Sequence, residues 1–105
     1  WIRNPIVHPA SALKVDAIKR LRGYSGGFAS EDFDLWLRAA RGGARFHGLG
    51  RPLIEYRIHD DQAKGARLAY AEGAGYKLRE VLVGSGFRYL IGAMISLGKA
   101  YLRGK

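Results

Sequence analysis

Residues 26–38 read Gly-Gly-Phe-Ala-Ser-Glu-Asp-Phe-Asp-Leu-Trp-Leu-Arg, and this stretch decides the fold of the region around it. Ser30 is a favourable N-cap residue, and the glycine pair at 42–43 can end a helix that begins after it. Between these signals, apolar residues recur at the i, i+3, i+4, i+7 spacing of one helix face: Phe33, Trp36, Leu37 and Ala40. The pattern predicts an amphipathic helix, with Asp34 and Arg38 paired on its exposed side.

Shorter elements are expected on both sides of this helix. Upstream, residues 10–15 suit a short strand and residues 16–21 a short helix. Downstream, residues 44–48 and 53–58 have the pattern of two short strands separated by a Gly-Arg-Pro turn. Beyond them, two stretches have helical patterns: 68–83, weakened by two internal glycines, and a cleaner one from residue 87. The pattern predicts short strands plus helices, followed by a helical tail.

Composition bounds the classes of protein that this chain can represent. With 105 residues and 48% hydrophobic content, it can form one small domain with a real core. The lack of cysteine excludes disulfides, thiolate metal sites and thiol catalysis, and is consistent with the cytosol. No signal peptide is visible, and the longest apolar run, 89–97, is too short to span a bilayer. Because the chain starts at Trp1 in mid-pattern, we expect a fragment of a longer protein.

The first turn of the predicted helix carries an acidic pair, Glu31 and Asp32, directly after a glycine-rich loop at 23–27. A helix N-terminus stabilises negative charge, and a carboxylate beside a flexible loop can accept a proton from an incoming hydroxyl. Acidic residues in a first turn are also ordinary helix-stabilising features. From the local residues alone, both interpretations stay open.

The stretch at 26–38 resembles the Glu-Asp-x-Asp-Leu-Trp-Leu-Arg signature of family 2 glycosyltransferases. Residues 21–24, Leu-Arg-Gly-Tyr, resemble the Gly-Gly-Tyr element that precedes it, with arginine in place of the first glycine. Residues 52–59, Pro-Leu-Ile-Glu-Tyr-Arg-Ile-His, resemble the stretch that follows it, and residues 4–9 resemble the segment that enters this half of the domain. Several spaced elements in the right order are a specific signal, and they cover about residues 4–65.

The resemblance implies an α/β fold of the GT-A type. Residues 1–65 would be the C-terminal, acceptor-side part of the catalytic domain, and residues 66–105 a helical extension. Members are inverting enzymes that move a sugar from a nucleotide-sugar donor to an acceptor hydroxyl, with Mg²⁺ or Mn²⁺ holding the leaving diphosphate. The family's nucleotide-binding half with its Asp-x-Asp motif is missing here, so we expect the fragment alone to be inactive.

The resemblance also implies roles for three titratable residues. Asp32 matches the family's catalytic base, and Glu31 matches its companion, which would contact the acceptor or orient the site. His59 matches the histidine that ligates the metal or touches the diphosphate in many such enzymes. The alternative for His59 is an ordinary histidine at a strand end, satisfied by the backbone.

Four further residues are substrate-binding candidates by the same resemblance. Gly26 and Gly27 match the glycine-rich loop near donor and acceptor, although a plain turn would need the same residues. Trp36 lies on the apolar stripe, which favours core or pocket wall over a sugar-stacking platform. Arg57 either meets phosphate or belongs to a solvated surface.

The tail from residue 87 has an apolar stripe with basic flanks: Phe87, Leu90, Ile91, Met94, Gly98 and Tyr101, beside Arg88, Lys99 and Arg103. Such a helix can lie on an anionic membrane surface, but Gly92 and Gly98 favour close packing against another helix. By resemblance, we expect cell-surface polysaccharide or glycolipid synthesis on a glycan or lipid-linked acceptor, in the cytoplasm or at the inner face of the membrane.

Two rival functions come from other classes. The formal charge of +9 favours polyanions, as in a basic nucleic-acid-binding module. However, the basic residues are scattered and no recognised nucleic-acid-binding motif is evident, so we expect no nucleic-acid partner. The other rival is a catalytically silent interaction domain derived from a glycosyltransferase.

Overall fold

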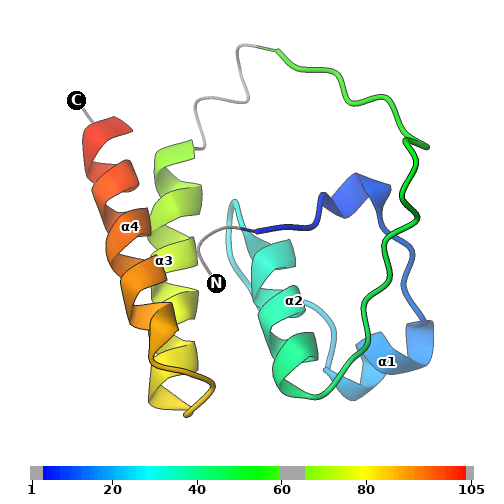
Figure 1. Ribbon diagram of the computed structural model, residues 1–105, viewed down its shortest axis with the longest axis horizontal. Coiled ribbons are helices and arrows are strands. Elements are labelled where there is room, and N and C mark those ends of the chain that lie inside the picture. Colours follow the sequence, from blue (N-terminus) through cyan, green and yellow to red (C-terminus); the bar gives the residue numbers. More distant parts are fainter. Residues whose placement is uncertain (1–3, 60–65, 104–105) are drawn as a thin grey trace.

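The computed structural model describes residues 4–59 and 66–103, and in these ranges it is helical. The elements follow the order η1 (His8–Ala10), α1 (Val15–Arg20), α2 (Glu31–Arg41), α3 (Ala66–Leu82) and α4 (Arg88–Arg103). In Figure 1, α3 and α4 lie side by side as an antiparallel hairpin, and α2 lies beside them. A long segment without regular structure leaves the end of α2 and runs around the outside of the molecule. The predicted boundary at residue 65 falls in 60–65, outside the described residues.

The core is centred on α2. Its buried apolar residues, Phe33, Leu35, Trp36, Leu37 and Ala39, face α3 on one side and the N-terminal segment on the other. This confirms the amphipathic helix predicted from residues 30–43. Its burial contributes about 1.5–3 kcal/mol for each large apolar side chain.

Both α2 and α3 end in the same glycine-dependent motif. At the end of α2, Gly43 has φ +81°, its N–H donates to the carbonyl of Ala40, and the N–H of Ala44 donates to the carbonyl of Ala39. This pair of bonds satisfies carbonyls that the last helical turn leaves free, which defines a Schellman motif. Gly84, also at φ +81°, repeats the arrangement at the end of α3 and turns the chain into α4.

The hairpin of α3 and α4 is packed through small side chains. The buried residues of α4 are Gly92, Ala93, Ser96 and Ala100, which allow close approach to Ala74 of α3. The predicted apolar stripe of α4 faces outward instead, because Phe87, Ile91, Met94 and Tyr101 are all exposed. Gly92 packs against α3 as expected, whereas Gly98 is exposed.

The predicted α/β fold is wrong for the part of the chain that the structure describes. The stretches 10–15, 44–48 and 53–58 form no strands, and the described residues contain no sheet. A strand gains its backbone hydrogen bonds from a neighbouring strand, and no second extended segment is paired with 44–58 among these residues. The segment runs as an elongated, unpaired stretch without regular structure (Figure 1), and its side chains are exposed.

Candidate active site

Asp32 lies in the first turn of α2 and is half-buried. Its carboxylate is hydrogen-bonded to a residue of the N-terminal segment. The amide Nδ2 of Asn4 donates to Oδ2 of Asp32 at 3.0 Å. Asn4 is itself fixed, because its Oδ1 accepts the backbone N–H of Ile6 at 3.1 Å. Glu31 precedes Asp32 and is exposed. The acidic pair therefore lies at the positive end of a helix, with only one member tied to a neighbouring segment.

The loop before α2 is anchored to α3 by a single carboxylate. Oε1 and Oε2 of Glu72 accept the backbone N–H groups of Phe28 and Ala29 at 2.6 and 3.0 Å. Ser30 is the N-cap residue as predicted, but its hydroxyl donates to the carbonyl of Ala69 at 3.1 Å and caps no amide of α2. The start of α2 is thus positioned by α3 and not only by its own capping residue.

Both candidate glycines of the loop have conformations that side chains rarely adopt. Gly26 has φ +127° and Gly27 has φ +108°. A Cβ on Gly27 would run into the hydroxyl of Tyr76 and would lie 3.3 Å from the backbone nitrogen of Glu31. Gly27 therefore lets the loop lie directly against α3.

Asp34 and Arg38 do form the predicted i, i+4 pair, with Nε of Arg38 2.9 Å from Oδ2 of Asp34. The prediction that this pair is exposed is wrong: the Asp34 side chain is 1% exposed and that of Arg38 is 13% exposed. Asp34 also accepts from Ser25 Oγ at 2.6 Å and is paired with Arg79 of α3. Arg38 in turn donates to the carbonyls of residues 21 and 23 at 2.6 and 2.7 Å. The pair ties the glycine-rich loop, α2 and α3 together.

The electrostatics of this cluster favour an ionised Asp34. Burial by itself raises the pKa of Asp34, but hydrogen bonds from Ser25, Arg79 and Arg38 outweigh it, and the net pKa is lowered. Burial raises the pKa of the Tyr76 hydroxyl, and the carboxylate of Glu72 adds to that effect. The cluster is structural, since no member of it lines the cavity described next.

A cavity of about 270 Å³ opens between α2, α3 and α4, with Asp32 and Asn4 on one wall. The opposite wall includes Lys77 and Tyr70 of α3 and Lys99 of α4. A larger hollow of about 480 Å³ lies against α1 and contains none of the candidate site residues. The smaller cavity is therefore the one that brings Asp32 together with other polar groups.

Trp36 lies in the core behind this site. It is 5% exposed, and its ring centroid lies 6.1 Å from that of His8. Nε2 of His8 is 2.6 Å from the hydroxyl of Tyr24, and these two rings meet edge to face. The indole N–H has no hydrogen-bond partner among the described residues. Trp36 thus supports α2 against the N-terminal segment.

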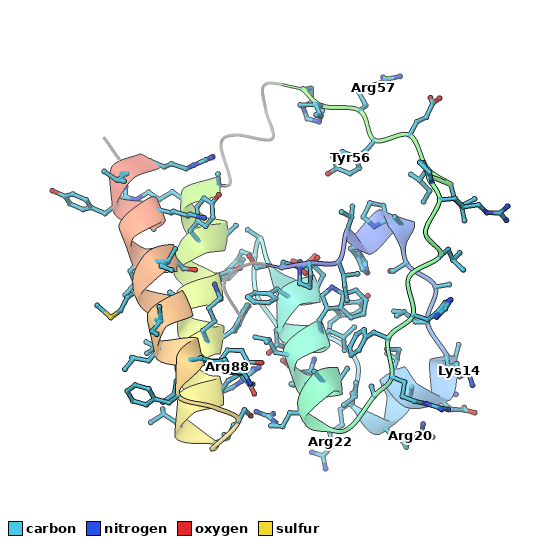
Figure 2. The ribbon with its side chains drawn as sticks, viewed as in Figure 1. Lys14, Arg20, Arg22, Tyr56, Arg57 and Arg88 are labelled. Carbon is cyan, nitrogen blue, oxygen red and sulfur yellow. The ribbon has the colours of Figure 1, made fainter. Side chains whose placement is uncertain are left out.

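Arg57 and His59 lie apart from this arrangement, on the extended segment that precedes residue 60. Figure 2 shows Arg57 on the outer segment, away from α2 in this view. Within the described ranges, no three His, Asp or Glu side chains gather in a way that could hold a metal ion. The described residues alone therefore do not form a metal site.

Three residues around the cavity and loop were not singled out from the sequence: Glu72, Lys77 and Asn4 in its role toward Asp32. Hydrophobic periodicity could not find the two on α3, because its buried face carries Gly73, Ala74, Lys77 and Glu80. Such a face has no apolar stripe to detect.

Comparison with known proteins points to one class, the glycosyltransferases. Over 82 residues, 76% of this chain, the sequence is 45% identical to the O-antigen biosynthesis glycosyltransferase WbnJ of Escherichia coli. Over 73 residues, 67% of this chain, it is 33% identical to the UDP-Gal:alpha-D-GlcNAc-diphosphoundecaprenol beta-1,3-galactosyltransferase of Escherichia coli. No family model and no solved structure matches the chain.

The chain spans about a third or less of these relatives, 32% and 26% of their lengths. The similarity supports the glycosyltransferase class that the motifs predict, while membership of family 2 stays a prediction. None of the helices in the described ranges is long and apolar enough to cross a membrane.

Proposed function

We propose that the protein containing this chain transfers a sugar from a nucleotide-sugar donor to an acceptor hydroxyl, with inversion at the anomeric carbon, as in family 2 glycosyltransferases. The observation that carries the proposal is the place of Asp32, whose carboxylate lies on a cavity wall at a helix N-terminus and is oriented by Asn4. Similarity to two glycosyltransferases supports it, one of them named for O-antigen biosynthesis. The setting would be synthesis of a cell-surface polysaccharide or glycolipid.

In this mechanism Asp32 acts as the general base. An oxygen of its carboxylate takes the proton of the acceptor hydroxyl, and the acceptor oxygen attacks the anomeric carbon from the face opposite the leaving group. A bond forms between that oxygen and the carbon, the glycosidic bond to the nucleoside diphosphate breaks, and the electron pair leaves with the diphosphate. The bond from Asn4 holds one carboxylate oxygen, so the other is left to meet the hydroxyl. Glu31, exposed beside it, would contact the acceptor.

The glycine-rich loop would shape the acceptor side of the same site. Gly27 keeps the backbone close to α3, Gly26 adopts the positive φ that the turn needs, and Glu72 fixes the two residues that follow them. Positioning of this kind raises the rate because the hydroxyl meets the base in a defined geometry. Arg57 would meet a donor phosphate from the extended segment.

We propose Mg²⁺ or Mn²⁺ as the cofactor of the whole protein, where it would neutralise the leaving diphosphate. Of the described residues, His59 is the candidate ligand, and the other ligands would have to come from residues outside those described. Chelation tests this dependence directly.

The outer face of α4 is the proposed contact with the inner surface of the membrane. Met94 and Leu102 on this face are 66% and 70% exposed, and basic residues lie along the same helix. An apolar face with flanking cations suits an anionic bilayer surface. Sedimentation with anionic vesicles tests the contact: Met94→Glu should reduce binding severalfold, whereas Leu53→Glu, at an equally exposed site on the extended segment, should not. Equal loss in both variants would contradict it.

The proposed function is tested by assaying transfer by the intact protein from UDP-, GDP- and dTDP-sugars to polyprenyl-diphosphate-linked acceptors. Asp32→Asn should abolish transfer while nucleotide binding survives. Transfer by Asp32→Asn at the wild-type rate would leave the acidic pair as a helix-stabilising feature. A wild-type protein that transfers from no donor would favour the silent interaction domain.

A further inference from the structure

The cavity between α2, α3 and α4 has walls of opposite charge. The carboxylate of Asp32 lies on the α2 side, and the lysines at 77 and 99 lie on the side made by α3 and α4. Ser96 and Tyr70 also line that cationic side. At about 270 Å³, the cavity is smaller than the usual site for a whole ligand, and it suits one polar part of a larger substrate.

The side chain of Lys77 is buried in the α3–α4 hairpin, and hydrogen bonds to α4 fix its ammonium group. Its side chain is 2% exposed, and Nζ donates to Ser96 Oγ at 2.6 Å and to the carbonyl of Gly92 at 3.4 Å. Nζ also lies 5.4 Å from the ring centroid of Phe33, which extends the contact to α2. Removing an ammonium from water is costly, and the contacts with Ser96, Gly92 and Phe33 offset part of that cost.

A second lysine adds like charge to the same wall. Nζ of Lys99 lies 5.6 Å from the ring centroid of Tyr70, and the guanidinium of Arg103 lies 5.2 Å from the same ring. Burial lowers the pKa of Lys77, and the nearby charge of Lys99 lowers it further. An anion in the cavity would offset both the burial of Lys77 and its repulsion from Lys99, because it would pair with the two ammonium groups at once.

We propose that this cavity is a subsite for the phosphate groups of the acceptor, held by Lys77 and Lys99 while the acceptor's sugar hydroxyl meets Asp32. The inference rests on the proposed function. Phosphate has the charge and the acceptor oxygens that ammonium and hydroxyl donors recognise. A donor nucleotide also carries phosphate next to the reacting carbon, so the test uses a separate probe for each substrate.

The outer face of α4 agrees with an acceptor whose phosphates are joined to a lipid. Lys99 lies on the same helix as the exposed apolar residues Met94 and Leu102. Of these, Leu102 is three residues from Lys99 on the helix surface, so the lipid chain of a diphosphate in the cavity would pass beside it. The subsite thus selects a class of substrate, the lipid-linked sugar diphosphates.

Binding by the intact protein, measured calorimetrically without turnover, tests the subsite. The probes are geranyl diphosphate for the acceptor's diphosphate and UDP for the donor. Lys99→Met should weaken geranyl diphosphate binding by about tenfold or more, the loss expected for one charge-assisted hydrogen bond. UDP binding should stay unchanged. Lys19→Met is the matched control, because it removes the same charge from an exposed lysine on α1.

Three results would overturn the proposal: geranyl diphosphate binding that survives Lys99→Met, equal losses in Lys99→Met and Lys19→Met, or a loss confined to UDP. Lys77→Met provides a second test, with circular dichroism to check that the helices are retained. It should weaken the same probe at least as much as Lys99→Met. Because these measurements need no transfer, they succeed or fail separately from the Asp32→Asn assay of the proposed function.

Discussion

Replacing Asp34 by asparagine tests how the glycine-rich loop, α2 and α3 are held together. The substitution keeps the size of the side chain but removes the charge that pairs with Arg38 and Arg79. Asparagine can still accept one hydrogen bond, for example from Ser25, yet its NH₂ group would face a guanidinium. Arg38 would then be left without a carboxylate partner, whereas Arg79 would keep its ion pair with Glu80.

The magnitude follows from how deeply these groups are buried. Removing one partner of a fully buried pair costs roughly 3–5 kcal/mol. The Arg38 and Arg79 side chains are 13% and 31% exposed, so water can take part of the role of Asp34. We therefore expect the free energy of opening of α2 to fall by about 2–3 kcal/mol, which is roughly a 30- to 160-fold faster amide exchange.

Hydrogen exchange of the α2 backbone amides in the intact protein is the assay, because it reports local opening free energy segment by segment. Asp16→Asn is the matched control, since Asp16 is an exposed aspartate in the first turn of α1. It should leave α2 exchange within about threefold of wild type, as surface substitutions usually do. If Asp34→Asn accelerates α2 exchange no more than Asp16→Asn does, the reasoning about the buried cluster is refuted.

Three further outcomes are expected. Gly27→Ala should destabilise the loop by about 1–3 kcal/mol, because φ is +108° and the new methyl group meets Tyr76. Hydrogen exchange of the loop amides measures this loss. Adding Tyr76→Phe to the same protein should recover part of the stability, and no recovery would count against the contact. The pKa of Asp34 is lowered on folding, so its contribution to stability is present above the unfolded-state pKa of about 4 and is lost as the pH falls below that value. Amide protection of α2, corrected for intrinsic exchange, should therefore drop below about pH 4 in the wild type and change less in Asp34→Asn. Identical pH profiles would contradict this. Chelation with EDTA should abolish sugar transfer, Mn²⁺ should restore it, and full activity in EDTA would rule out the metal requirement.

The helices could be predicted because their signals are local. The stripe of α2 lies between Ser30 and the glycines at 42–43, and both ends are found where the sequence predicts them. Helix α3 begins two residues before and ends one residue before the predicted 68–83, and α4 begins one residue after the predicted start at 87. Caps and periodicity are set by residues within a few positions of each other, so no tertiary information is needed.

The wrong predictions all depend on partners distant in the sequence. The stretch 44–58 is extended, yet a strand exists only with a neighbour to pair with. Asp34 and Arg38 look like an exposed pair until Arg79, 45 residues after Asp34, completes a buried cluster. The stripe of α4 faces outward because its opposite face of small residues makes the closer contact with α3.

In the candidate site, too, features set by neighbouring residues could be predicted, and contacts between residues distant in the sequence could not. The position of Asp32 in a helical first turn was predictable, and its bond to Asn4 needs the N-terminal segment to fold back over α2. The lysines of the cavity lie on α3 and α4, and no sequence pattern indicated that this hairpin would pack beside Asp32. Contact of Gly26, Gly27, Trp36 and Arg57 with substrate, and of His59 with a metal or the diphosphate, stays a prediction.

The most direct test of the central claim, that Asp32 is the general base, is the single-turnover rate constant of sugar transfer in wild type and Asp32→Asn. This measurement isolates the chemical step from product release. Loss of a general base should lower the rate constant by roughly 10²–10⁴-fold, with nucleotide binding unchanged. A rate constant within about threefold of wild type, in a protein that still binds nucleotide, would contradict the claim.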